Sequence, residues 1–212
     1  MFDFIDIYCE RLGPGFWAEP VNALTNISFF IAALFAFRLA WQSKVLHFKT
    51  GVLIALTAAM GIGSFLFHTF ATGWAELADV LPILLYQICV IAFYANDIIR
   101  LKKVQTAALL GLFFFTVYLS GFIPNSVLNG SLMYAPAILF LGGLAVWHWS
   151  HAQIEKFGLF LALGVFLVSI TFRSIDMQMC AAFPMGLHFL WHILNGGLLY
   201  LTTRAYVLNS QR

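Results

Sequence analysis

The sequence is poor in charge. Only 9% of its 212 residues are Asp, Glu, Lys or Arg, whereas 62% are hydrophobic and 23 are Phe. A soluble domain needs a charged surface and does not carry this balance. A chain of this composition is expected to lie in lipid as a multi-pass membrane protein.

Several motifs of soluble enzymes are also missing. The chain has no glycine-rich phosphate loop, no serine nucleophile elbow, and no Cys-x-x-Cys pair among its three cysteines. These absences argue against phosphate-loop enzymes, serine hydrolases of the elbow type and dithiol redox proteins. No nucleic-acid partner is expected, because the few basic residues form a rim without a domain to present them.

Long apolar stretches, by contrast, recur along the chain. A helix needs roughly 20 apolar residues to cross a bilayer, and short polar breaks separate seven such stretches. The expected spans are 21–42, 50–71, 75–96, 104–122, 131–149, 157–174 and 184–207. They use most of the chain, so the sequence predicts an all-α membrane protein with one seven-helix transmembrane domain over residues 1–212.

The charges are unevenly divided between the two sides of such a bundle. One side carries nine of the eleven cations, which are Arg38, Lys44, Lys49, Arg100, Lys102, Lys103, Lys156, Arg204 and Arg212. The other side carries Arg11, Arg173 and most of the acidic residues, among them Asp3. Because Lys and Arg concentrate in cytoplasmic loops, we expect an exoplasmic N-terminus and a cytoplasmic C-terminus. An acidic, cation-poor exoplasmic end suits a divalent metal.

Three histidines fall at this exoplasmic end. His68 lies near the end of the second span, and His188 and His192 open the seventh with a spacing that puts both rings on one helix face. An imidazole inside a membrane span is costly unless it is paired or ligating. One histidine alone could simply hydrogen-bond a neighbouring helix, but three at one depth favour a shared metal ion. The remaining histidines are expected at the cytoplasmic interface; they are His47, His148 and His151.

Three imidazoles with an open fourth position are typical of a catalytic zinc site, since structural zinc sites are usually closed by four protein ligands. Zinc lowers the pKa of a bound water to about 7, which prepares it to attack a carbonyl. Asp79 falls at a similar depth in the third span and is the expected general base and later acid. Ser64, one turn before His68, is expected to donate a hydrogen bond to the developing oxyanion. Its alternative role is that of a small packing residue beside Gly61 and Gly63.

These residues resemble the alkaline ceramidases, within a wider group of seven-span membrane hydrolases that includes the adiponectin-receptor-like proteins. The resemblance covers nearly the whole chain. It rests on Trp17–Asn22 with Thr25 and Asn26, Gly63 and Ser64 with Phe67 and His68, Asp79 with Leu81 and Pro82, Asp176 with Cys180, and His188 with Trp191 and His192. It implies that the three histidines bind zinc, that Asp79 activates water and that Ser64 assists. The implied reaction is hydrolysis of ceramide to a sphingoid base and a fatty acid.

The resemblance also implies a calcium site before and at the start of the first span. The candidate ligands are Asp6, Tyr8 through its carbonyl, Glu10, Glu19 and Asn22. The chain departs from the family pattern here, because the segment between Glu10 and Glu19 is shorter and Leu12 replaces a polar ligand. The alternative is that Glu19 and Asn22 cap the first helix.

Two cysteines and a charged pair lie near the same end. Cys9 and Cys180 both fall on the exoplasmic side, where a disulfide can persist, and a similar bridge is found among alkaline ceramidases. Cys89, in the middle of the third span, is expected to be a packing residue. Arg173 and Asp176 are expected to form an exposed ion pair of little energetic weight.

Other function classes stay open at this stage. A receptor-like member of the same wider group would signal through a partner, although the short cytoplasmic loops offer little surface and no obligatory protein partner is expected. A His/Asp proton or ion relay would show interrupted helices or internal repeats, and no clear repeat is present. A metal centre buried among helices is reachable mainly from lipid or through a narrow exoplasmic mouth. The residues themselves therefore favour hydrolysis of an acyl bond in an amphiphile.

Overall fold

The protein is all-helical where it is described. The computed structural model describes residues 4–151 and 153–210, so Asp3 and Arg212 lie outside it. Its helices are α1 (Pro20–Thr25), α2 (Ile27–Gln42), α3 (Phe48–Phe70), α4 (Gly73–Asp97), α5 (Lys103–Ser120), the 3-10 segment η1 (Val127–Tyr134), α6 (Ala135–Ser150), α7 (Gly158–Met179) and α8 (His188–Asn209). No strand occurs in these ranges, and one isolated bridge pairs Phe4 with Thr72. The all-α part of the prediction is confirmed.

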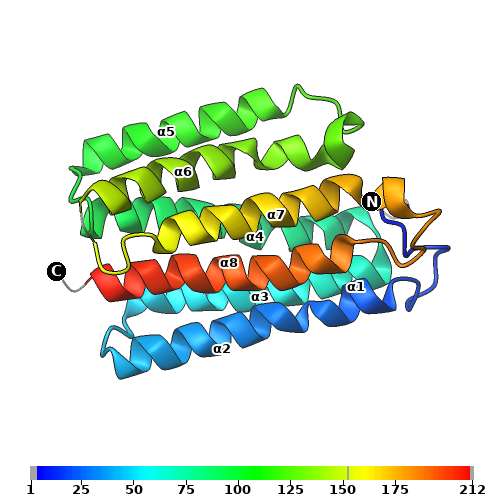
Figure 1. The fold of residues 1–212 in the computed structure, drawn as a ribbon, viewed down its shortest axis with the longest axis horizontal. Helices are drawn as coiled ribbons and strands as arrows, with labels where there is room; N and C mark the ends of the chain where they lie inside the picture. Colours follow the sequence, from blue (N-terminus) through cyan, green and yellow to red (C-terminus); the bar gives the residue numbers. More distant parts are fainter. Residues whose placement is uncertain (1–3, 152, 211–212) are drawn as a thin grey trace.

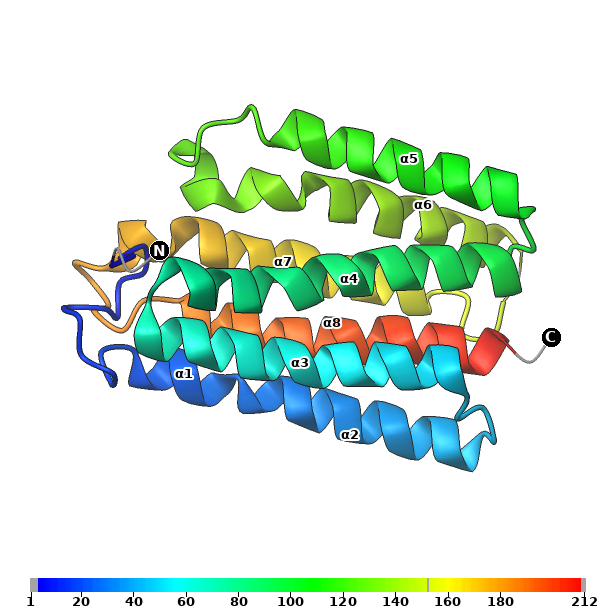
Figure 2. The same cartoon turned by 180° about the vertical axis from the view of Figure 1, so that it is seen from behind.

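The long helices run side by side with nearly parallel axes, as Figures 1 and 2 show. In chain order α2 packs on α3, α3 on α4, α6 on α7 and α7 on α8, while α5 lies outermost against α4 and α6. The last helix, α8, returns to α2 and also touches α3 and α4. The two ends of the chain lie at opposite ends of the bundle.

Six helical segments are long and apolar enough to cross a membrane, which indicates a multi-pass membrane protein. They are 20–42, 48–70, 73–97, 103–120, 127–150 and 158–179. Among the described residues α8 does not meet this test, so the count of seven spans stays a prediction. Polar residues lower the mean hydropathy of α8, and the helix buries them against the rest of the protein. They include His188, His192, Asn195, Thr202 and Thr203.

The observed helices begin and end close to the expected positions, with informative differences. The helix α7 continues five residues past its expected end at 174, because Arg173 and Asp176 are buried inside the bundle rather than exposed. The helix α8 begins at His188 rather than at 184, after Gly186 turns the chain with a φ of +67°.

Close backbone contacts bring the polar residues of different helices together. A Cβ atom at Gly63 would lie 2.0 Å from the carbonyl oxygen of Ala78, so the backbones of α3 and α4 touch there. A Cβ atom at Gly196 would lie 2.9 Å from the carbonyl oxygen of Ser28, where α8 meets α2. Both contacts flank the end of the bundle that carries the three histidines.

At the opposite end, the structure corrects the prediction for His148. Its side chain is buried rather than interfacial, with Nδ1 bonded to the Tyr94 hydroxyl. Its Nε2 lies 3.1 Å and 3.2 Å from the carbonyl oxygens of Ile154 and Glu155. The loop between α6 and α7 folds over this histidine. His47 and His151 are exposed.

Candidate metal centre

Three imidazoles converge where α3 ends and α8 begins. His68 lies in the last turn of α3, and His188 and His192 lie in the first two turns of α8. All three side chains are buried, and one nitrogen from each lies within 4.8 Å of the other two. The Nε2 atoms of His68 and His192 are only 3.1 Å apart. The structure therefore brings the three predicted histidines together.

The outer hydrogen bonds of two rings assign their protons. His68 Nδ1 lies 2.6 Å from Glu19 Oε2, and a carboxylate can only accept. His192 Nδ1 lies 3.0 Å from the Thr25 hydroxyl, which donates its own proton to the Val21 carbonyl at 2.8 Å. Both Nδ1 atoms therefore carry hydrogen, as the outer nitrogens of metal-bound imidazoles do.

The inner nitrogens fit a metal ion. With hydrogen on each Nδ1, the two neutral rings present lone pairs on Nε2 to each other at 3.1 Å, and a metal cation bound by both nitrogens would make this approach favourable. The Nδ1 atom of His188 is buried without a hydrogen-bond partner in the described parts of the chain. Buried polar atoms are normally satisfied, so a metal ion held by these three rings would account for both observations.

Glu19 sits behind His68 in a buried network that the sequence did not predict. Besides His68, its carboxylate accepts from Arg11 Nε and, at 3.0 Å, from Asn22 Nδ2. Arg11 also donates to the His68 carbonyl oxygen at 2.7 Å and is only 3% exposed. Burial raises the pKa of Glu19, but the hydrogen bonds from His68, Asn22 and Arg11 outweigh it and hold this pKa below its ordinary value.

Glu10 caps the first helix. Its two carboxylate oxygens accept from the backbone amides of Val21 and Asn22 at 2.7 Å and 2.8 Å. Glu19, the expected cap, makes no side-chain cap at this helix. Burial raises the pKa of Glu10 above its ordinary value, although the two amide hydrogen bonds act against that rise.

The five candidate calcium ligands mostly have other partners in the structure, so the calcium site stays a prediction. Asp6 is exposed, and the Tyr8 carbonyl accepts from the Arg11 amide at 3.2 Å. The oxygens of Glu10 and Glu19 are taken by the donors just described, and only the Asn22 Oδ1 atom is buried without a partner. The Arg11 guanidinium instead supplies positive charge to Glu19 from within the chain.

The N-terminal segment is tied to the start of α8. A disulfide joins Cys9 to Cys180, and the Cys9 amide donates to Asp176 Oδ2 at 3.0 Å. The other oxygen of Asp176 accepts from the amides of Leu187 and His188 at 2.6 Å and 2.9 Å. Asp176 thereby joins three segments and orients the first histidine of α8.

Tyr8, held by this connection, covers the three-histidine cluster. Its ring stacks on that of His188 with centroids 3.6 Å apart and planes inclined by 18°. Burial raises the pKa of the Tyr8 phenol above its ordinary range. The ring therefore contributes a neutral, apolar cover.

The expected ion pair between Arg173 and Asp176 is wrong. The Asp176 carboxylate is used by backbone amides, and Arg173 is buried. Its guanidinium donates to the Asn129 carbonyl at 2.6 Å and to the Ser131 hydroxyl at 2.9 Å. These contacts hold η1 against α7 beside the site.

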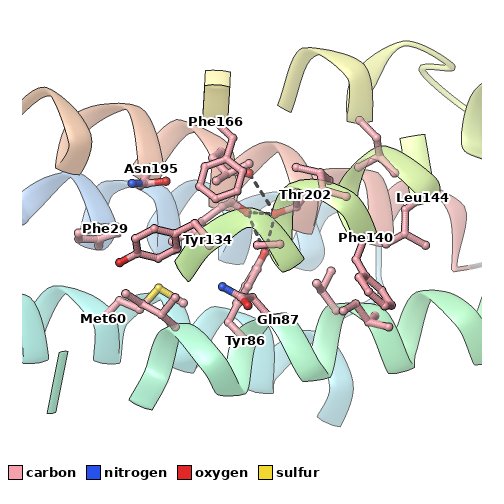
Figure 3. Close-up of a pocket in the computed structure, with 18 of the residues that line it drawn as sticks. Phe29, Met60, Tyr86, Gln87, Tyr134, Phe140, Leu144, Phe166, Asn195 and Thr202 are labelled. Carbon is pink, nitrogen blue, oxygen red and sulfur yellow. Dashed lines mark hydrogen bonds between the residues drawn. The ribbon is translucent and has the colours of Figure 1, made fainter. Parts of the chain in front are cut away.

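Ser64 and Asp79 face the histidines from α3 and α4. The Ser64 hydroxyl lies 3.5 Å from His192 Nε2, and the Asp79 carboxylate is close enough to interact with that hydroxyl. Asp79 is half-buried because it borders a cavity. The cavity encloses about 100 Å³, begins at Ser64 and Asp79, and continues between α4, α6, α7 and α8 (Figure 3). Its walls are mostly aromatic and aliphatic.

A helical membrane bundle with a buried three-histidine centre beside a carboxylate and an apolar cavity defines a class of intramembrane protein suited to metal-assisted hydrolysis. The Ceramidase family model matches residues 13–211, nearly the whole chain. The chain therefore belongs to the ceramidase family, which confirms the resemblance and identifies a ceramidase-type amidohydrolase with a lipid substrate. No curated protein matches the sequence.

Proposed function

We propose that this protein is a zinc-dependent ceramidase that hydrolyses ceramide to a sphingoid base and a fatty acid. Membership of the ceramidase family supports an amide as the bond that is cleaved and a lipid as the substrate. The observation that carries the zinc dependence is the pair of facing Nε2 acceptors at 3.1 Å, with a third imidazole whose buried nitrogen lacks a partner.

Zinc is the metal that this donor set favours. Neutral imidazole nitrogens suit zinc well, and three protein ligands are typical of its catalytic sites. His68, His188 and His192 would hold it. When bound, zinc acts as a Lewis acid that activates water for attack on a carbonyl carbon.

The surrounding residues supply positioning and proton transfer. Glu19 and Thr25 keep hydrogen on the Nδ1 atoms of His68 and His192, so that both Nε2 atoms face inward. The Asp79 carboxylate accepts a proton from the attacking water and returns it to the leaving nitrogen. The Ser64 hydroxyl donates a hydrogen bond to the negative charge that develops on the amide oxygen. The cavity takes up hydrocarbon chain and keeps the amide out of bulk water.

The site belongs on the exoplasmic side of a seven-span bundle in this proposal. The disulfide lies at the histidine end, where an oxidising compartment would preserve it. The predicted cytoplasmic cations lie at the other end of the bundle. Lys49 is in the first turn of α3, whose last turn carries His68, and Lys102 directly precedes α5. The chain then works as one domain with a membrane lipid as its partner and needs no protein partner.

The proposal is tested by measuring zinc content and hydrolysis in the same preparations. We expect wild-type protein to hold about one zinc ion per chain, the stoichiometry of a single three-histidine site. His188→Ala and His192→Ala should each lose the zinc together with release of fatty acid from ceramide. His151→Ala removes an exposed histidine far from the site and should leave both unchanged.

Two outcomes would contradict the proposal. Hydrolysis at the wild-type rate by zinc-free protein would remove the metal from the mechanism. Zinc-loaded, folded wild-type protein that releases no fatty acid from ceramide would instead favour a receptor-like role, and proton or ion flux through zinc-free protein in vesicles would favour a relay.

A further inference from the structure

The cavity beside the three histidines is lined by a carboxamide side chain from α8. Asn195 lies on α8, lines the cavity together with Ser64 and Asp79, and is only 7% exposed. Its Nδ2 atom is buried and has no hydrogen-bond partner within residues 4–151 and 153–210. A buried donor without a partner costs free energy. The position therefore calls for a ligand group.

The position of Asn195 determines which part of a ligand its side chain can contact. It follows His192 by three residues, so the two side chains share a helix face and lie about 4.5 Å apart along the axis. Figure 3 shows Asn195 toward the end of the cavity with Phe29 and Met60, away from Phe140 and Leu144. A substrate whose carbonyl is held at the histidines would present to Asn195 atoms only a few bonds from that carbonyl.

The chemistry of the carboxamide indicates which kind of ligand group Asn195 can bind. A carboxamide offers a donor and an acceptor on neighbouring atoms. The atom without a partner is the donor Nδ2, so the ligand group has to offer an acceptor. A hydroxyl oxygen offers one, whereas methylene groups do not. The neighbouring walls include Phe29, Met60 and Phe166, whose apolar side chains do not compete with Asn195 for such a group.

We propose that Asn195 is a specificity-determining residue that binds a hydroxyl group of the lipid close to the scissile amide. This inference rests on the proposed function. It adds that the enzyme selects hydroxylated lipid amides over analogues without the hydroxyl. The hydroxyl belongs either to the amine-derived chain beside the nitrogen or to the acyl chain beside the carbonyl.

The same cavity supplies a matched control. Gln87 is a second carboxamide in its lining, on α4. It follows Asp79 by eight residues, which places it about 12 Å deeper along the helix axis. It is therefore too far from the metal centre to reach a hydroxyl near the amide.

The experiment compares lipid amides of equal chain length that carry a hydroxyl on the amine-derived chain, on the acyl carbon next to the carbonyl, or on neither. The zinc-loaded protein in detergent hydrolyses each, and kcat and KM are measured for wild type, Asn195→Leu and Gln87→Leu. We expect wild type to prefer one hydroxylated lipid over the plain lipid by about 10- to 100-fold in kcat/KM, the range for one buried hydrogen bond. Asn195→Leu should bring this ratio close to 1, whereas Gln87→Leu should keep it.

Binding of the same lipids to zinc-free protein, measured by the shift in its melting temperature, separates this inference from the proposed function. Selective binding by wild type that Asn195→Leu abolishes supports the role of Asn195 even where no lipid is hydrolysed. The inference is overturned where wild type binds and cleaves the three lipids equally, or where Asn195→Leu keeps the wild-type ratio. If Asn195→Leu does not fold, Asn195→Ala is measured in its place.

Discussion

Each histidine of the metal centre is positioned by a different kind of partner. Glu19 holds His68 through a charged hydrogen bond, Thr25 holds His192 through a hydroxyl, and Tyr8 holds His188 by ring stacking. The Arg11 guanidinium in turn balances the negative charge of Glu19. The centre therefore depends on residues from the N-terminal segment and α1 as much as on α3 and α8.

Asp79→Asn should keep zinc and lose turnover. The amide has nearly the shape of the carboxylate but cannot take a proton from water, and removal of a general base typically costs 10²–10⁴-fold in rate. Zinc per chain and kcat for ceramide are measured in the same preparation. Glu76→Gln, on the exposed face of the same helix, is the matched control. An Asp79→Asn enzyme with wild-type kcat would show that another group is the base.

Arg11→Gln should destabilise the protein, because it leaves the buried Glu19 carboxylate without its cation. Removing one partner of a buried ion pair costs about 3–5 kcal/mol. Thermal unfolding in detergent measures the loss, with exposed Arg38→Gln as the control.

The same unfolding experiment tests whether calcium binds. With Arg11 in place, millimolar calcium should leave the melting temperature of wild type unchanged, since ligands stabilise only the state that binds them. A calcium-dependent rise in wild type would show that the N-terminal carboxylates rearrange around the ion.

The sequence predicted the site residues but not the contacts that orient them. His68, His188, His192, Asp79 and Ser64 were found from their helical spacing and depth, which are local properties. The partners of two histidines are not local, since Glu19 is 49 residues from His68 and Thr25 is 167 residues from His192. The sequence positions of Glu19 and Thr25 do not indicate which histidine each of them contacts.

At the scale of helices, the site depends on the close pairing of α3 with α4. Gly63 allows the α3 backbone to touch the carbonyl of Ala78, the neighbour of Asp79. The relative positions of Asp79 and His68 thus depend on the distance between the two backbones.

Gly63→Ala should impair both folding and turnover. The added methyl group would meet backbone at 2.0 Å, so α4 has to move and carry Asp79 with it. Overpacking of this kind costs about 1–3 kcal/mol. The melting temperature and kcat for ceramide are the measurements.

Gly51→Ala tests the same change elsewhere on α3, at a glycine with nothing within 4 Å of an added Cβ. It should be neutral or slightly stabilising, since alanine favours helix. Equal effects of the two substitutions would mean that close packing at Gly63 does not position Asp79.

Helix prediction from hydropathy succeeded for six spans and weakened at α8 for a physical reason. Hydropathy measures the composition of a segment and not its neighbours. The apolar composition of α2 to α7 is that of helices that face lipid, whereas α8 turns its polar residues toward α2, α3, α4 and α7. The extension of α7 to Met179 was missed because Arg173 and Asp176 look like surface residues in sequence.

At the scale of the whole molecule, the orientation in the membrane is open to a direct test. A variant with Cys89→Ala and Leu12→Cys places one reactive thiol in the N-terminal segment, where Leu12 is 90% exposed. A second variant with Cys89→Ala and Lys102→Cys places it between α4 and α5. An impermeant maleimide should label position 12 on intact cells and position 102 only after permeabilisation, because cations mark the cytoplasmic side. The reverse pattern would invert the bundle.

The cavity could not have been predicted from the sequence. Its lining comes from seven segments, among them α2 with Phe29 and η1 with Tyr134. It exists because α8 closes the bundle against α2, a long-range contact with no local signature. The three-histidine cluster could be predicted because its residues lie at a similar depth in the bundle. The cavity depends on how all the helices pack together.

The helix that carries two of the three histidines is also the one whose composition is least suited to enter lipid alone. Several of its polar residues contact helices that precede it in the chain, as His192 does with Thr25 of α1 and Thr203 does with Tyr86 of α4. The three histidines therefore come together only once α8 has docked on those earlier helices.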